Sequence, residues 1–184
     1  MILGQHVRLR PVERDDLPRY VKWFSDPELR GYLSAHLPIG QAQEEKWFEK
    51  NLNGGDTQAL AIDAQPADLG VGPWVHIGGC SFPQIDWRNS HAELGIFIGA
   101  RDYWGRGYGT DTVQTLAAWG FDTLNLNRIY LRVHSDNERA IRCYEKVGFQ
   151  HEGRLRQHNF HAGAYRDTLY MGLLRSDWAR LPAA

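Results

Sequence analysis

Apolar and polar residues alternate along several short stretches of the chain, whereas other stretches repeat their apolar positions with a helical period. The first pattern predicts strands and the second predicts amphipathic helices. Strands are expected at residues 7–11, 58–63, 74–82, 91–98, 128–134, 149–157 and 165–174. Helices are expected at residues 13–25, 41–52 and 108–122, and after Asn137, a good N-cap residue. No repeat, low-complexity segment or linker interrupts this order, so one domain is predicted over residues 1–184.

A glycine-rich turn precedes the helix expected at residues 108–122. Gly105, Gly107 and Gly109 alternate there with Arg106 and Tyr108. Glycines at a helix start let a ligand approach the backbone closely, and the first N–H groups of a helix have no internal partner. These donors and the positive end of the helix dipole favour an anion, and phosphate suits them best. The turn is therefore predicted to bind a phosphate group.

The spacing of this turn excludes two common phosphate-binding motifs. No lysine follows the glycines, as the P-loop pattern G-x-x-x-x-G-K-[ST] requires. The dinucleotide pattern G-x-G-x-x-G needs a third glycine, but Thr110 and Thr112 stand at the two positions where it would fall. Taken alone, the turn leaves open the alternative of a glycine-rich connection that binds no ligand.

Charge and composition narrow the classes of function. The formal net charge of the 184-residue chain is -1, so no overall field attracts nucleic acid. No apolar run reaches the length of a membrane span and no signal peptide is recognisable, so no membrane partner is expected. Cys80 and Cys143 lie far apart, and no group of histidines, cysteines and carboxylates has metal-ligand spacing. A cytoplasmic protein without a metal is therefore expected.

Two motifs resemble those of the GCN5-related N-acetyltransferases (GNAT). The stretch from Trp104 to Gly109 resembles their pyrophosphate loop, [RQ]-x-x-G-x-[GA], with Trp104 where that family more often has Arg or Gln. The stretch from Asn137 to Phe149 is similar to their segment N-x-x-[SA]-x-x-x-Y-x-K-x-G-F and follows at the expected distance. The closing strand resembles the RimJ/RimL-type branch. The resemblance is strong over residues 91–173 and weak over residues 1–70.

This resemblance implies an α/β (α+β) single-domain GNAT fold, with helices on both faces of a mixed, twisted sheet of about seven strands. The fourth and fifth strands would splay apart and admit acetyl-CoA, with main-chain groups of strand four along the pantetheine arm and the glycine turn on the pyrophosphate. Arg106 would add a cation to the phosphates, and Asn137 would reach the pantetheine end. The implied cofactor-binding residues are Phe97, Ile98, Gly99, Trp104, Gly105, Arg106, Gly107, Tyr108, Gly109, Thr110 and Asn137.

Tyr144 is the implied general acid. It stands where the family has a tyrosine near the cofactor sulfur, so its hydroxyl would protonate the leaving thiolate. The spacing of Tyr144 from Ala140 and Val147 also fits a core aromatic on the apolar face of a helix.

Glu93 is the candidate general base. On a strand it would share a face with Gly95 and Phe97 and look into the acceptor side of the cleft. The alternative is a carboxylate that is hydrogen-bonded to a neighbouring loop and plays no part in catalysis. The resemblance also leaves open that the substrate amine loses its proton to solvent, without a base. His134, at the end of the strand 128–134, is a secondary candidate base.

These motifs predict an enzyme that transfers the acetyl group of acetyl-CoA to a primary amine by direct attack. The alternative is an inactive acetyl-CoA-binding sensor or interaction module, which would have no reason to keep Tyr144. The resemblance implies either a protein N-terminus, as in ribosomal proteins, or a small amine as acceptor, and a homodimer is left open. Residues 26–40 and 158–165 are expected on the acceptor side, and their lack of a dense acidic patch counts against a polycation.

Overall fold

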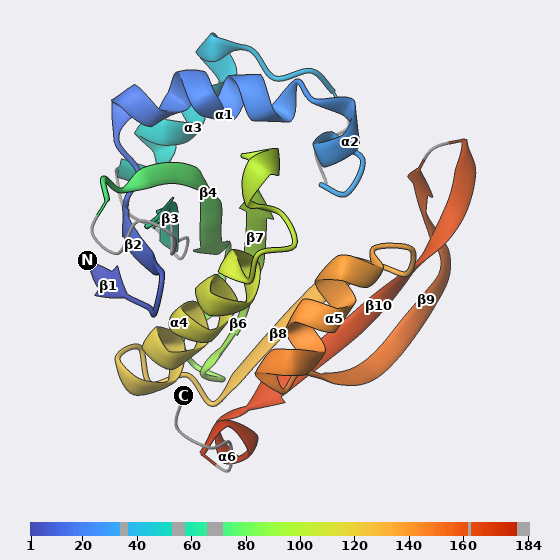
Figure 1. The fold of residues 1–184 in the computed structure, drawn as a ribbon. Helices are drawn as coiled ribbons and strands as arrows, with labels where there is room; N and C mark the ends of the chain where they lie inside the picture. Colours follow the sequence, from blue (N-terminus) through green and yellow to red (C-terminus); the bar gives the residue numbers. More distant parts are fainter. Residues whose placement is uncertain (34–36, 53–57, 66–71, 162, 180–184) are drawn as a thin grey trace.

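The computed structural model describes residues 1–33, 37–52, 58–65, 72–161 and 163–179. Within these residues the strands form two five-stranded sheets, which diverge at one end (Figure 1). The first sheet has the order β1 (Ile2–Leu3), β2 (Val7–Pro11), β3 (Gln58–Ala64), β4 (Val75–Phe82) and β7 (Gly95–Ile98). The second has the order β5 (Ile85–Asp86), β6 (His91–Glu93), β8 (Arg128–His134), β10 (Ala164–Leu174) and β9 (Gln150–His161).

Helices lie on both faces of the first sheet. The helix α4 (Tyr108–Asp122) contacts β1, β2, β7 and β8, and α5 (Glu138–Val147) lies beside α4 (Figure 1). The helices α1 (Leu17–Phe24) and α3 (Gln41–Leu52) pack on each other and cover the opposite face. Two shorter helices are α2 (Pro27–Arg30) and α6 (Arg175–Trp178). The expected α+β fold with helices on both faces is confirmed, although two sheets replace the single continuous sheet.

The strand expected at residues 91–98 is interrupted at Leu94, and this break creates the opening between the sheets. Before it, β6 runs parallel to β8, with Glu93 opposite Tyr130. The N–H of Leu94 donates the last hydrogen bond to this neighbour, at 2.7 Å from the carbonyl oxygen of Tyr130. From Gly95 onward β7 pairs only with β4 and forms the edge of the first sheet. The prediction of one continuous strand is wrong because the two halves pair with different neighbours.

The helix α5 begins and ends where the sequence predicts. The Asn137 side chain caps it by accepting a hydrogen bond from the N–H of Ala140, and Gly148 ends it with a φ of 99°. The loop expected at residues 26–40 contains the short helix α2, whose Glu28 N–H donates to the Asp26 carboxylate at 3.0 Å. Residues 34–36 of that stretch lie outside the described residues.

Buried polar groups fix the start of α1 to the first sheet. The Arg10 guanidinium of β2 donates to both carboxylate oxygens of Asp16, at 2.7 and 2.9 Å, and its Nε donates to Asp63 at 2.9 Å. The Nδ1 of His76 lies 3.0 Å from Asp16 Oδ1. Burial would raise the pKa of Asp16, but Arg10, His76 and the N–H of Glu13 outweigh it, so the pKa lies well below its usual range.

The hydrophobic core lies between α4 and the two sheets. Its fully buried side chains come from strands of both sheets and from α4, so the divergence of the sheets at one end does not divide the core. The largest of these side chains are Phe82, Phe121, Leu9, Ile62, Ile77, Leu116, Ile129, Leu131, Met171 and Leu173, together with Leu126 from the connection between α4 and β8. The site described below therefore rests on elements that are fixed by packing.

Candidate active site

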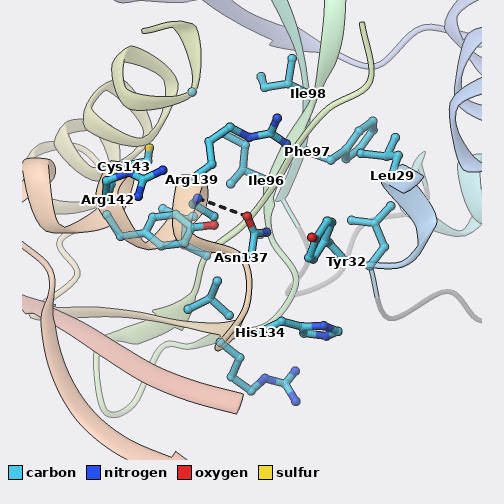
Figure 2. A pocket seen from close by; sticks show the side chains of 18 of the residues that line it. Leu29, Tyr32, Ile96, Phe97, Ile98, His134, Asn137, Arg139, Arg142 and Cys143 are labelled. Atoms are coloured by element: carbon cyan, nitrogen blue, oxygen red, sulfur yellow. Dashed lines mark hydrogen bonds between the residues drawn. The ribbon is translucent and has the colours of Figure 1, made fainter. Parts of the chain in front are cut away.

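A cavity of about 700 Å³ opens where the two sheets diverge. Its walls come from β7, the glycine turn, the end of β8, and α5. Part of β10 and the region after α2 close one end of the cavity. Figure 2 shows Arg142 and Cys143 at one side, Leu29, Tyr32 and His134 at the other, and Ile96, Arg139 and Asn137 between them. This volume falls within the range of roughly 300–1,000 Å³ that is typical of small-molecule sites.

The glycine turn has the backbone conformation that its sequence suggested. Gly105 and Gly107 have φ angles of +70° and +89°, which L side chains rarely adopt. A Cβ at either position would meet no atom within 4 Å, so conformation and not space requires glycine there. Gly107 precedes α4, and the N–H groups of Tyr108, Gly109 and Thr110 in its first turn have no carbonyl partner within the helix. The turn therefore presents an array of donors suited to an anion.

The side chains of the turn divide between the core and the cavity. Tyr108 is buried with its ring 5.3 Å from that of Tyr103, so Tyr108 offers the cavity only its backbone. Arg106 lies over these two rings at 5.9 Å and is absent from the cavity lining that the structure describes. Thr110 does line the cavity, and its hydroxyl donates to Cys143 Sγ at 3.5 Å. The position of Arg106 gives no support to its expected role as a phosphate cation.

Trp104 joins the turn to both walls of the cavity. Its indole Nε1–H donates to the carbonyl oxygen of Ile98 at 2.7 Å, which ties the turn to β7. Across the cavity, the guanidinium of Arg139 in α5 lies 3.9 Å from the centre of the Trp104 ring. This is a close cation–π contact. Trp104 therefore contacts β7 on one wall of the cavity and α5 on the other.

The main-chain groups of β7 alternate between its neighbour β4 and the open cavity. The N–H of Gly99 donates to the carbonyl of Ile77 at 2.8 Å, so Gly99 and Phe97 direct their N–H groups toward β4. Ile96 and Ile98 consequently direct theirs into the cavity. Of the three residues expected along the pantetheine arm, Ile98 has a backbone N–H that is placed to donate a hydrogen bond into the cavity. The N–H of Ile96, which was not expected there, is placed in the same way. The N–H of Gly99 is already used.

Asn137 lies at the entrance to α5, facing the cavity. Its Oδ1 accepts the N–H of Ala140 at 3.2 Å, as the dashed line in Figure 2 shows. This contact leaves the Nδ2 group as the donor that is directed toward other partners. The expected cap is confirmed, and the same side chain lines the cavity.

Tyr144 combines a buried ring with a place in the cavity lining. Its residue is 8% exposed, and its ring lies 6.0 Å from that of Phe149. Burial raises the pKa of Tyr144, with a smaller contribution from Cys143, so its hydroxyl stays protonated at neutral pH. The ring packs in the core, as the second interpretation of the sequence expected, and the residue also lines the cavity. Its role as general acid stays a prediction.

Glu93 lines the cavity and is held by a cation. Arg132 of β8 donates from Nε to Glu93 Oε1 at 2.7 Å and from Nη2 to Oε2 at 3.1 Å. This carboxylate raises the pKa of Arg132. Glu93 is thus hydrogen-bonded as the structural alternative suggested, but its partner is a strand residue and not a loop.

Comparison with known proteins identifies the family to which this site belongs. Residues 6–150 match the family described as Acetyltransferase (GNAT) domain. The chain belongs to the GNAT acetyltransferases. It is therefore an acetyl-CoA-dependent N-acetyltransferase.

Several relatives of this GNAT chain match it nearly end to end. An uncharacterized N-acetyltransferase, p20, from Bacillus licheniformis is 31% identical, with 95% of this chain and 96% of the relative covered. The spermidine N(1)-acetyltransferase of Escherichia coli (strain K12) is 28% identical, with 94% and 88% covered. The "Putative ribosomal N-acetyltransferase YdaF" of Bacillus subtilis (strain 168) is 32% identical, with 96% and 95% covered.

Solved structures share the fold of this GNAT enzyme. A spermidine N-acetyltransferase from Vibrio cholerae, in complex with CoA and spermine, superposes with a TM-score of 0.86 at 24% identity. That comparison covers 96% of this chain and 100% of the other. At this identity the likeness concerns the fold.

The cavity of this GNAT chain contains positive residues that sequence reasoning did not assign. They are Arg132 on β8 and three residues of α5, namely Arg139, Arg142 and Lys146. The three α5 positions are spaced as residues on one helix face, so a helical wheel of the predicted helix would have grouped them. Arg132 could not be found in this way, because its contact with Glu93 depends on the pairing of β6 with β8.

The other end of the cavity carries aromatic and polar groups. The ring of Tyr32 lies 6.1 Å from that of His134 in an edge-to-face arrangement, and both are labelled in Figure 2. His158, Asn159 and Thr168 of the β9–β10 hairpin complete this end, with His158 Nδ1 and Thr168 Oγ1 3.1 Å apart. Parts of the segments expected on the acceptor side are therefore present, apart from residues 34–36 and 162, which are not described.

Two further expectations concern metals and membranes. Among the described residues, no group of three or more histidine, cysteine, aspartate or glutamate residues could hold a metal ion. No helix in the described ranges is long and apolar enough to cross a membrane.

Proposed function

We propose that this GNAT enzyme acetylates a primary amine by direct attack on acetyl-CoA, without an acyl-enzyme intermediate. The amine nitrogen would bond to the acetyl carbonyl carbon, and the carbon–sulfur bond would then break. Cys143 is the one thiol in the described cavity lining. Burial raises its pKa, partly offset by the hydrogen bond from Thr110, and a raised pKa makes a thiol a poor nucleophile. This property of Cys143 is the observation that favours direct attack.

The proposal gives the backbone of the cavity a role in binding and in charge stabilisation. The pyrophosphate of acetyl-CoA would lie on the free N–H groups of the glycine turn, and the pantetheine arm would follow the open edge of β7 from Ile98 toward Ile96. The thioester would then lie near the point where the sheets meet. There the N–H of Ile96 would donate to the carbonyl oxygen as it gains negative charge.

Two side chains would handle the protons of the reaction. Tyr144 would donate a hydrogen bond, and then its proton, to the departing sulfur. Glu93 would receive the proton of the attacking amine through a water molecule. Each oxygen of Glu93 already accepts one N–H of Arg132, and a carboxylate oxygen can accept a second hydrogen bond.

The charge of the cavity favours an acceptor that is not a polycation. Glu93 is the one carboxylate among the described lining residues, and Arg132 already neutralises it. The other charged side chains of this lining are Arg139, Arg142 and Lys146. A polyamine with several ammonium groups would find no free carboxylate there, whereas a protein N-terminus or a small monoamine requires none. We therefore propose the latter acceptors, even though relatives include spermidine N(1)-acetyltransferases.

An assay of CoA release tests this proposal. Acetyl-CoA is supplied with spermidine, with a monoamine, or with a peptide that has a free N-terminus and no lysine. The expected order of kcat/KM places the peptide or the monoamine above spermidine. Preferential use of spermidine would contradict the charge argument, and an acetylated Cys143 trapped before amine addition would contradict direct attack.

A further inference from the structure

Trp104 changes the chemistry of the glycine turn. It occupies the position at which the family pattern more often has an arginine or a glutamine. An indole N–H is a donor without charge, and here it is used by the carbonyl of Ile98 at 2.7 Å. Arg106, the one cation within the turn, is absent from the described cavity lining. The turn itself therefore brings no cationic side chain into the cavity.

Arg139 brings a cation to this point from the opposite wall. Its guanidinium lies 3.9 Å from the centre of the Trp104 ring, and both residues line the cavity. Figure 2 shows the Arg139 side chain extending from α5 toward Ile98, at the end of β7. The guanidinium of Arg139 thus lies at the start of the glycine turn, beside Trp104.

Arg139 differs from the other two arginines of the described lining, Arg132 and Arg142, because no carboxylate in the described part of the chain pairs with it. Arg142 is paired with Glu138 at 3.0 Å, and Arg132 with Glu93 at 2.7 Å. A guanidinium that stacks on a ring keeps its N–H groups free at its edge. Two parallel N–H groups of this kind match two oxygens of a phosphate. Stacking therefore holds Arg139 in place without using the donors that an anion needs.

We propose that Arg139, held on the ring of Trp104, binds the pyrophosphate of acetyl-CoA at the glycine turn. The cation comes from α5 because the turn carries tryptophan in place of a polar side chain. This inference rests on the proposed placement of the pyrophosphate at the turn. It assigns Arg139 as a cofactor-binding residue and Trp104 as its positioning residue.

Calorimetry with CoA and with dephospho-CoA tests the assignment without any amine acceptor. Arg139→Gln should weaken both ligands equally, by about tenfold to a hundredfold, as expected for a lost hydrogen bond to a charged group. Arg142→Gln is the matched control, because it makes the same change one turn along α5 at a residue that already has a partner. Arg142→Gln should cost less than Arg139→Gln for dephospho-CoA. Thermal unfolding of each variant excludes a loss of fold.

A second variant tests the role of Trp104. In the Arg139→Gln background, Trp104→Arg should recover most of the lost affinity, because it places a guanidinium on the turn itself. In the wild-type background the same substitution should bring no such gain. Recovery in the first background alone supports the proposal.

Three results would overturn the proposal. Unchanged affinity of Arg139→Gln for CoA would show that Arg139 does not bind the cofactor. A loss seen with CoA but not with dephospho-CoA would place Arg139 at the 3′-phosphate. A double variant that recovers no affinity over Arg139→Gln alone would show that a cation at the ring of Trp104 does not serve the glycine turn. A failure of acetyl transfer with intact CoA binding would instead contradict the proposed function alone.

Discussion

Glu93 and Arg132 form a two-point ion pair on neighbouring strands at the edge of the cavity. The Nε of Arg132 lies 2.7 Å from Glu93 Oε1, and its Nη2 lies 3.1 Å from Oε2. β6 and β8 run parallel up to this point, and the N–H of Leu94 donates the last hydrogen bond to β8 before β7 pairs with the first sheet. The pair therefore stands where the two sheets separate, between the acceptor end and the thioester end of the proposed site.

The pair predicts different pH dependence for two substitutions. Glu93→Gln should lower turnover by about a hundredfold where the acceptor amine is mostly protonated, and by much less above the pKa of the amine, because a general base matters only in the first range. Arg132→Met is the matched control, since it breaks the pair but keeps the carboxylate. Rates measured across pH should show a far smaller pH-dependent loss for Arg132→Met. Equal losses at every pH in both variants would show that the pair is structural.

Tyr144→Phe should lower turnover by about tenfold to a hundredfold while acetyl-CoA affinity changes little, because the hydroxyl would act on the departing thiolate in the transition state. Burial raises the pKa of this hydroxyl, which makes it a weaker acid. The loss of turnover should therefore be small for the loss of a general acid. The ring and its contact with Phe149 are kept, so the melting temperature should hardly change. Single-turnover rates and calorimetry on one preparation test this. An unchanged chemical rate would assign Tyr144 to packing.

Substitutions in the glycine turn should show whether its glycines are required by the backbone conformation or by the space around them. Gly107→Ala places a Cβ where the φ is +89° and no atom lies within 4 Å, so only the backbone conformation resists it. A left-handed L residue costs about 1–2 kcal/mol, so CoA affinity should fall by roughly tenfold as the turn relaxes and moves its N–H groups. Gly109→Ala is the control, because its Cβ would make an ordinary contact with Cys143 Sγ at 3.9 Å. Equal affinities of the two variants for CoA would contradict the proposed anion site.

Asp16→Asn should destabilise the fold in a pH-dependent way. The folded-state pKa of Asp16 lies below its value of about 3.9 in the unfolded chain, so ionised Asp16 stabilises the fold above that pH. This contribution is lost as the pH falls toward the folded-state pKa. Removal of one partner from a buried ion pair costs about 3–5 kcal/mol.

Urea unfolding at several pH values measures this effect. The difference between wild type and Asp16→Asn should be full at pH 7 and should shrink below about pH 4. Asp15→Asn is the control, because Asp15 is the exposed acid next to Asp16 and should have little effect. A difference that stays constant down to acid pH would show that Asp16 acts through packing and not through its charge.

The sequence by itself determined the elements and residues that depend on local chemistry. Glycine at positions 105 and 107 follows from the left-handed backbone of the turn, and the residues Asn137 and Gly148 bound α5 because capping is decided within a few neighbouring residues. The strand at 128–134 and the helix at 108–122 were predicted with their observed bounds because their apolar periods are regular.

Only the tertiary structure decided how these elements share their hydrogen bonds and charges. Alternation of apolar residues cannot show that 91–98 changes partners at Leu94, because both halves remain extended. For the same reason the sequence could not show that Gly99 gives its N–H to Ile77, or that Glu93 is held by Arg132. The contact of Arg139 with Trp104 joins α5 to the glycine turn across the cavity. Pairing between distant segments depends on the register of strands and the packing of helices, which no local pattern encodes.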